Sequence, residues 1–258
     1  MALALAVLLL CAACGIARPV PAVQGVASRP DNVTVLLFGD SLLRQAAPEI
    51  ALQAEANVLP VDVVDKSQNG AGLLTTYGFD AAPRDILQAH LAEFEPDYVV
   101  VEFSGNHWFA DILPGYEDLE YGSEEWFAAW WENYDLIVAD IVAAGAQPLT
   151  VIPPPYGPLS PGAVTRTTLA EDYPGAASAH GSPTIDWREA LASKDCIVWI
   201  AKPGGGLKSM PLCYADDLRD PEAGAIETVR AADMLHMSEA GAQRAAFWTV
   251  AVLSDLLA

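Results

Sequence analysis

The sequence predicts an α/β protein, a three-layer α/β/α sandwich around a mostly parallel five-stranded sheet. Three observations lead to this prediction. Apolar runs of strand length alternate along the chain with segments of helical periodicity, as in parallel sheets that are covered on both faces. The 258 residues suit one sizeable domain. A hydrophobic fraction of 52% is ample for its core.

Each predicted strand is a short apolar run with residues beside it that stop a strand. The first run starts after Asn32 and stops before Gly39, and Pro153 ends the fourth. The five strands are predicted at 33–38, 58–64, 98–103, 147–152 and 196–200.

The helices are predicted from apolar residues that recur at three- and four-residue steps. One follows Ser41, with Pro48 near its first turn and an apolar stripe through Ile50, Leu52 and Ala54. Others are predicted at 84–93, 123–144 and 185–193, and the last is capped by Ser238, with a stripe of Ala246, Phe247, Val250 and Leu253. The aromatic stripe of the helix at 123–144 is predicted to be core and not a sugar-binding platform.

The first 17 residues carry no charge and resemble the apolar part of a secretory signal. The Cys-Ala-Ala-Cys-Gly string at 11–15 resembles a bacterial lipoprotein processing site, with Cys14 as the lipidated residue. We therefore expect an exported protein, either secreted or tethered to the cell envelope by a lipidated Cys14. A flexible tether is expected at 18–31 and one domain at 32–258, with an insertion at about 201–230 that flanks the cleft.

Export leaves two cysteines in the folded part, Cys196 and Cys213. In an oxidising compartment an even pair is most simply a disulfide, whose loop would contribute about 3 kcal/mol. The alternative is a pair of buried thiols.

The formal net charge of −21 argues against partners that are held by their own negative charge. Nucleic acid and anionic membrane surfaces are therefore excluded as electrostatic partners. We expect a monomer whose acidic surface serves solubility.

A nucleophile is predicted in the Gly-Asp-Ser-Leu string at 39–42. Ser41 follows a buried strand and precedes a helix, so its hydroxyl faces the rim of the sheet where ligands bind. The alternative is an ordinary helix cap, which Asp and Ser also favour.

A base is predicted near the other end of the chain, where Asp233 precedes His236 by three residues. An imidazole can take the serine proton if a carboxylate fixes its tautomer. The oxyanion would be held by the Ser41 amide, by a glycine amide of Gly70 or Gly72, and by the side-chain amide of Asn106.

Four strings therefore follow one another along the chain: Gly-Asp-Ser-Leu at 39–42, Asn-Gly-Ala-Gly at 69–72, Ser-Gly-Asn at 104–106 and Asp-Met-Leu-His at 233–236. In this order they resemble the blocks of the SGNH, or GDSL, hydrolase superfamily, which has a flavodoxin-like fold. The resemblance implies that Ser41, Asp233 and His236 form a catalytic triad, and that Ser41, Gly72 and Asn106 form the oxyanion hole. The third block departs from the usual Gly-x-Asn-Asp, with Ser104 for the glycine and His107 for the aspartate. His107 is a candidate substrate contact or rival base.

The predicted activity is hydrolysis of small acyl esters by a serine esterase, with a small-molecule or glycan ester as substrate. Two alternatives stay open, an O-acyltransferase that uses a sugar hydroxyl as acceptor and a non-catalytic envelope-binding lipoprotein. No cofactor or metal is expected, because a zinc site of His107 and Asp111 lacks an obvious third ligand.

Overall fold

A computed structural model describes residues 32–107, 111–154, 162–191 and 236–258, and the backbone of short strands at 197–201, 207–211, 218–219 and 226–227. Within these residues, no helix is long and apolar enough to cross a membrane. The predicted leader and tether, which contain Cys14, lie outside the described residues, and so do Cys196 and Cys213.

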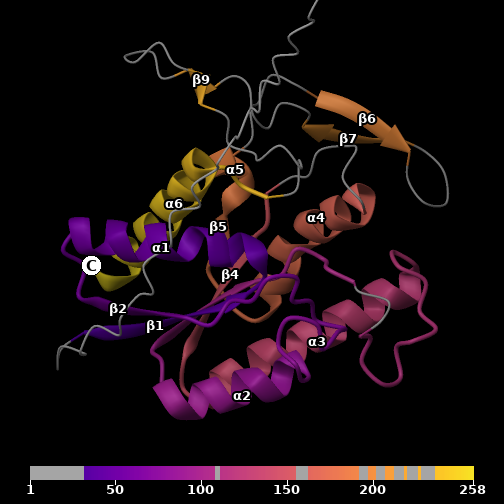
Figure 1. The fold of residues 1–258 in the computed structure, drawn as a ribbon, viewed down its shortest axis with the longest axis horizontal. Helices are drawn as coiled ribbons and strands as arrows, with labels where there is room; N and C mark the ends of the chain where they lie inside the picture. Colours follow the sequence, from indigo (N-terminus) through magenta and orange to yellow (C-terminus); the bar gives the residue numbers. More distant parts are fainter. Residues whose placement is uncertain are drawn as a thin grey trace, which may run out of the picture.

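Five parallel strands form the central sheet, in the order β2-β1-β3-β4-β5 (Figure 1). The chain adds β2 on one side of β1 and then returns to add β3 on the other side. This reversal makes β1 and β3 neighbours and creates a switch point at their carboxyl ends, where ligands bind in open sheets of this kind. The strands are β1 (Val33–Gly39), β2 (Val61–Asp65), β3 (Tyr98–Glu102), β4 (Gln147–Ile152) and β5 (Thr184–Asp186).

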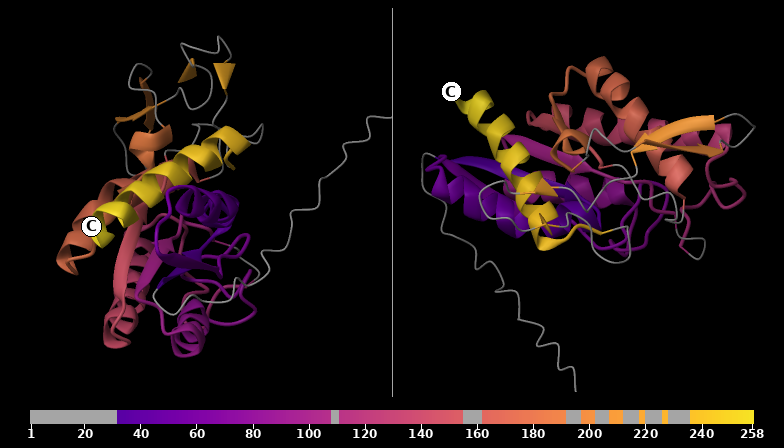
Figure 2. Two further views of the ribbon diagram at one scale, coloured as in Figure 1. Left: turned by 90° about the vertical axis from the view of Figure 1, so that its left-hand side faces the viewer. Right: turned by 90° about the horizontal axis from the view of Figure 1, so that it is seen from above.

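Helices cover both faces of this sheet (Figure 1, Figure 2). Helices α1, α5 and α6 pack on one face, while α2, α3 and most of the buried side chains of α4 pack on the other. The predicted three-layer architecture is therefore confirmed. The helices are α1 (Ser41–Ala56), α2 (Pro83–Phe94), α3 (Glu124–Ala143), α4 (Ala163–Ala179), α5 (Trp187–Leu191) and α6 (Glu239–Leu257).

Each face of the sheet has its own apolar core, because successive side chains of a strand point to opposite faces. Val35 and Leu37 of β1 belong to the core under α1, α5 and α6. Leu36 and Phe38 of the same strand belong to the core under α2, α3 and α4.

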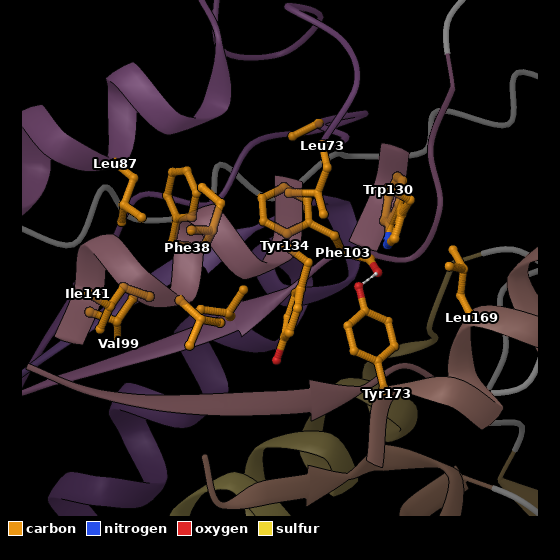
Figure 3. Packing of buried hydrophobic residues seen from close by; sticks show 14 of the residues in the cluster. Phe38, Leu73, Leu87, Val99, Phe103, Trp130, Tyr134, Ile141, Leu169 and Tyr173 are labelled. Carbon is orange, nitrogen blue, oxygen red and sulfur yellow. Dashed lines mark hydrogen bonds between the residues drawn. The ribbon is translucent and has the colours of Figure 1, made fainter. Parts of the chain in front are cut away.

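The second core is the more aromatic of the two, and Figure 3 shows part of it. The rings of Phe38 and Phe103 meet edge to face, with their centroids 5.6 Å apart. The hydroxyl group of Tyr173 in α4 donates a 2.7 Å hydrogen bond to the carbonyl oxygen of Phe103, just past β3. This bond attaches α4 to the end of a central strand.

The aromatic stripe of α3 is core, as predicted. Trp126, Trp130 and Tyr134 are completely buried, whereas Val142 at the end of the predicted stripe is 54% exposed. Ser123 caps the helix by accepting a 3.1 Å bond from the amide of Trp126.

The prediction of the fifth strand is wrong. The sheet is completed by Thr184–Asp186, which pairs with β4, so the helix predicted at 185–193 starts only at Trp187, as α5. The segment predicted as the fifth strand forms β6 (Ile197–Ala201), which pairs antiparallel with β7 (Leu207–Pro211) in a separate sheet. A three-residue edge strand is too short to produce a distinct apolar run, which is why the sequence does not reveal it. Strands β8 (Leu218–Arg219) and β9 (Ile226–Glu227) form another antiparallel pair.

Helix α1 begins earlier than predicted. Its first residue is Ser41, so Pro48 lies inside the helix and not in its first turn. Ile50 and Ala54 are buried, but Leu52 is 58% exposed, because its position falls on the outer side of the helix. The helix register is thus set by the cap at Asp40 and not by the proline.

Helix α6 is capped by Ser238 as predicted, through a 3.1 Å bond from the amide of Gly241. Ala246, Val250 and Leu253 are buried, but Phe247 is 63% exposed and does not belong to the predicted stripe.

Candidate active site

The carboxyl ends of β1 and β3 carry two of the predicted strings. Gly39 of β1 pairs with Glu102 of β3, so the residues that follow each strand start side by side. The approach is close enough that a Cβ atom on Gly39 would lie 2.1 Å from the carbonyl oxygen of Glu102. Glycine is therefore required there for the two strings to meet.

Ser41 is the first residue of α1 and is 8% exposed. Its Oγ lies 3.1 Å from Nε2 of His236, although 195 residues separate the two along the chain. The structure therefore brings the predicted nucleophile and the predicted base to hydrogen-bonding distance. Asp233 lies outside the described residues.

The loop that carries His236 is attached to the helix that carries Ser41. The amide of Met237 donates a 3.0 Å bond to Oε1 of Gln45 in α1. Met237 is also buried in the core between α1 and α6, which pack along each other. The imidazole is thus placed by the docking of α6 against α1.

Asp40 is the centre of a buried hydrogen-bond network and is itself completely buried. Its Oδ1 accepts from the amide of Leu42, which caps α1. Its Oδ2 accepts from the Ser104 amide at 2.9 Å, from the Ser104 hydroxyl and from Nδ2 of Asn106 at 3.0 Å. One carboxylate therefore joins the start of α1 to the loop after β3.

The second string lies against the third. Nδ2 of Asn106 donates a 2.9 Å bond to the carbonyl oxygen of Ala71. A Cβ atom on Gly72 would lie 2.3 Å from the carbonyl oxygen of Asn106, so only glycine permits this contact. Gly70, the alternative donor, has a φ of 75° and is half-buried.

The backbone amides of Ser41 and Gly72 have no hydrogen-bond acceptor among the described residues. The Ser41 amide belongs to the first turn of a helix, where N–H groups lack intrahelical partners and the helix dipole favours negative charge. An amide without an acceptor is able to donate to an oxyanion.

The orientation of the Asn106 amide is fixed by a residue that the sequence did not identify. Nη2 of Arg166 in α4 donates a 2.9 Å bond to Oδ1 of Asn106. Because guanidinium only donates, and Asp40 and the Ala71 carbonyl accept, Nδ2 must face the latter two. Arg166 had no sequence signal, because no helix was predicted around it and a lone arginine has no motif.

A second acidic residue is buried beneath the network. Glu102 is completely buried, and neither carboxyl oxygen has a partner of good hydrogen-bond geometry among the described residues. Burial, together with the negative charge of Asp40, raises the pKa of Glu102 well above its ordinary value. Burial of the Glu102 carboxyl group beside Asp40 therefore favours its protonated form.

Residues 37–244 match the profile of the GDSL-like Lipase/Acylhydrolase family. The chain belongs to this family. The predicted resemblance to the SGNH/GDSL superfamily is confirmed, and the protein is a hydrolase of carboxylic ester bonds. None of the curated proteins matches the chain.

Solved structures of several other enzymes share the fold of this GDSL hydrolase. The acetyl xylan esterase AlAXEase matches with a TM-score of 0.58 and 12% identity, over 86% of this chain and 100% of that chain. Est24, a carbohydrate acetylesterase from Sinorhizobium meliloti, matches with a TM-score of 0.55 and 14% identity, over 87% and 100%. The aryl esterase of M. Smegmatis matches with a TM-score of 0.55 and 15% identity, over 87% and 100%.

His107, the unusual residue of the third block, lies in an aromatic cluster beside the site. Its Nδ1 accepts a 3.1 Å bond from Nε1 of Trp126, and its ring stacks on Tyr121 at 5.3 Å. Burial lowers the pKa of His107, so the ring is neutral and carries its proton on Nε2. In that tautomer Nε2 carries a proton and Nδ1 already accepts from Trp126, so neither nitrogen is available to act as a rival base.

The zinc site considered for His107 and Asp111 gains no support from the part of the chain that the structure describes. No group of three potential metal ligands occurs there. The carbonyl oxygen of Asp111 instead accepts bonds from the hydroxyl of Thr75 at 2.8 Å and from the amide of Thr76 at 2.8 Å.

A surface cavity of about 650 Å³ lies at the opposite end of the strands from Ser41. It is lined by the ends of α2 and α3 and by Pro96 and Asp97, which precede β3. It shares no residue with the site.

Proposed function

We propose that this GDSL hydrolase cleaves small acyl esters, chiefly acetyl esters, with Ser41 as nucleophile and His236 as base. The observation that carries the proposal is the 3.1 Å separation of Ser41 Oγ and His236 Nε2. A serine hydroxyl is a weak nucleophile until a neighbouring base accepts its proton, and an imidazole nitrogen at this distance can do so.

In the proposed first step, Ser41 Oγ bonds to the ester carbonyl carbon while its proton moves to Nε2 of His236. The carbonyl oxygen becomes an oxyanion. The tetrahedral intermediate then collapses, the bond to the alcohol oxygen breaks, and His236 gives its proton to the departing alcohol. In the second step, water gives a proton to His236 and its oxygen bonds to the acyl carbonyl carbon. The bond from that carbon to Ser41 Oγ then breaks, His236 returns the proton to Oγ, and the carboxylic acid is released.

The proposed oxyanion hole uses the amides of Ser41 and Gly72, which have no other acceptor among the described residues. Asn106 is proposed as the third donor. Both of its Nδ2 hydrogens bond to protein oxygens, so it would serve by sharing one of them with the oxyanion. Asp233 is proposed to hold the charged form of His236, because it precedes the imidazole by only three residues.

The preference for small acyl groups, with carbohydrate esters as natural substrates, rests on indirect support. Two proteins of the same fold are an acetyl xylan esterase and a carbohydrate acetylesterase. The uncharged leader at 1–17 agrees with an exported enzyme that meets glycans outside the cell.

A panel of p-nitrophenyl esters of increasing chain length tests the proposal. We expect turnover of acetyl and butyryl esters, reduced by about 10⁴-fold or more in Ser41→Ala and in His236→Ala. His180→Ala is the matched control, because this histidine pairs with Asp135 on the surface. Equal activity of His236→Ala and the parent enzyme would refute the assignment of the base.

Product analysis with and without a glycan acceptor distinguishes hydrolysis from acyl transfer. Free acetate in the presence of the acceptor supports the esterase, whereas an acetylated acceptor shows that the acyl-enzyme reacts with sugar hydroxyl groups. Absence of turnover on every ester would favour the non-catalytic alternative.

Export and the disulfide are proposed together and have their own test. The mass of the mature protein from its natural cell shows whether the chain starts after residue 17 or at a lipidated Cys14. Peptide mapping without reductant shows whether Cys196 and Cys213 are joined. Recovery of an intact leader and two free thiols would contradict both.

A further inference from the structure

We propose that Arg166 is a positioning residue of the active site, which orients and polarises the Asn106 amide through a buried relay to Asp40. The proposal rests on the proposed function, because its effect is exerted through the oxyanion donor Asn106. Arg166 does not contact Ser41 or His236 in any hydrogen bond of the described residues.

Arg166 has a buried charge that requires compensation. The side chain is 8% exposed, in the first turn of α4, and its backbone amide bonds to the Gly162 carbonyl oxygen at 2.9 Å. A guanidinium group stays charged in proteins. A buried charge is costly unless it is paired and hydrogen-bonded, so the fold must supply an anion nearby.

Among the described residues, the carboxylate of Asp40 is connected to Arg166 by two short relays. Nη2 of Arg166 donates to Oδ1 of Asn106 at 2.9 Å, and Nδ2 of Asn106 donates to Oδ2 of Asp40 at 3.0 Å. Nη1 donates to Oγ of Ser104 at 3.3 Å, and the same hydroxyl donates to Oδ2 of Asp40. The Asp40 side chain accepts all four of its hydrogen bonds, as a carboxylate does.

The direction of each bond in the relays is forced. Arg166 can only donate and Asp40 accepts, so Ser104 and Asn106 must each accept on one side and donate on the other. Chains of hydrogen bonds with a common direction polarise one another. A cation on Oδ1 therefore makes Nδ2 of Asn106 a stronger donor, which matters most when an oxyanion forms.

The packing of α4 holds Arg166 in this position. A Cβ atom on Gly105 would lie 2.8 Å from Cδ1 of Leu169 and 3.4 Å from Cγ of Arg166, so the loop after β3 rests directly on α4. Tyr173, two turns further along α4, bonds to the carbonyl oxygen of Phe103. The helix thus contacts the site loop along one face.

The test compares Arg166→Ala, Arg166→Lys and Ser104→Ala with the parent on p-nitrophenyl acetate, per active site titrated with a phosphonate. We expect kcat to fall about 100-fold in Arg166→Ala with little change in KM, because a displaced donor acts mainly in the transition state. Arg166→Lys should recover only part of kcat, since an ammonium cannot make both bonds in the guanidinium geometry. Ser104→Ala, which removes one relay, should have the smallest effect.

Arg188→Ala is the matched control. Arg188 is half-buried, bonds to Asp186 at 2.6 Å and donates to the Ala170 carbonyl oxygen of α4, but it is bonded to no site residue described above. Millimolar guanidinium, far below denaturing concentrations, should restore kcat in Arg166→Ala and leave Arg188→Ala unchanged. A normal kcat per titrated site in Arg166→Ala would overturn the proposal, as would a loss without rescue by either lysine or guanidinium.

A readout that needs no esterase activity separates this proposal from the proposed function. In the parent protein, the side-chain amide hydrogens of Asn106 should be protected from exchange by their bonds to Asp40 and Ala71. Arg166→Ala should remove that protection. Unchanged protection would refute the positioning role even if the parent hydrolyses no ester.

Discussion

The two partners of the proposed catalytic pair are attached to the protein in different ways. Ser41 starts a helix whose cap, Asp40, is buried and hydrogen-bonded to three different residues. His236 lies on a loop whose described bonds to α1 are its own bond to Ser41 and the bond from the Met237 amide to Gln45. Ser41 is therefore held by a buried hydrogen-bond network, whereas His236 is held mainly by the packing of α6 against α1. The four predictions below test this contrast between a shared network and a docked loop.

The largest effect is expected for Asp40→Ala. This change removes the helix cap and the common acceptor of Ser104 and Asn106, the two residues to which the buried Arg166 donates. Loss of one partner of a buried ionic network typically costs about 3 to 5 kcal/mol. Denaturant unfolding should show this loss together with loss of esterase activity.

Asp97→Ala is the control for that experiment. Asp97 accepts one 2.8 Å bond from the Thr34 amide at the opposite end of the strands, at an exposed position. It should cost only about 1 kcal/mol and leave kcat unchanged. Equal losses of stability in the two variants would show that the Asp40 network is no stronger than a single surface bond.

The next effect is expected for Gly72→Ala, which tests the contact between the second and third strings. The new Cβ atom would lie 2.3 Å from the carbonyl oxygen of Asn106, so the two loops must separate. A displacement of about 1 Å can cost about 100-fold in turnover. Gly175→Ala in α4 is the control, because a Cβ atom there meets nothing within 4 Å. Full activity of Gly72→Ala would show that the oxyanion site does not depend on this contact.

A pH-dependent effect is expected for Glu102→Gln. Because the pKa of Glu102 is raised in the folded state, the folded protein keeps a proton that the unfolded chain loses above its ordinary pKa of about 4.3. The stability of the parent should therefore be full below that pH and fall as pH rises, by up to about 1.4 kcal/mol per unit until the folded group ionises.

The stability of Glu102→Gln should not fall in this way. The difference between its free energy of unfolding and that of the parent should therefore increase in favour of the variant as pH rises from 4 to 8. The exposed Glu120→Gln change is the control and should leave the pH profile of the parent intact. Parallel profiles for Glu102→Gln and the parent would mean that Glu102 is ionised in the folded protein.

The smallest effect is expected for Gln45→Ala, which releases the anchor of the base loop. Loss of one such bond should cost about 1 kcal/mol and lower kcat several-fold, because His236 becomes less well placed. Gln53→Ala is a close control, since Nε2 of Gln53 in α1 bonds to the carbonyl oxygen of Gln243 in α6 at 2.8 Å. If Gln53→Ala loses as much stability as Gln45→Ala but keeps a normal kcat, the bond between Gln45 and Met237 acts on the site and not only on stability.

Much of the fold could be predicted because strong local patterns coincide with tertiary burial. The apolar runs of β1 and β3 and the aromatic stripe of α3 are buried as expected. Helix α4 could not be predicted, because it contains Pro174 and Gly175 and buries polar residues such as Thr165 and Thr167 among its apolar ones. The short β5 also lacked a local signal, so a later apolar segment was mistaken for it.

The sequence by itself determined the order of the chemical groups: a serine after the first buried strand, glycines and an asparagine on later loops, and a histidine before the last helix. These groups could be identified because each lies next to the predicted end of a strand or the start of a helix, so the local sequence shows where in the fold it lies. The tertiary structure decided which groups meet. It brought His236 to Ser41, and it joined Arg166 to Asp40 through Ser104 and Asn106. A buried charge can be placed only when its partners are known, and here those partners come from strands and helices that are distant in sequence.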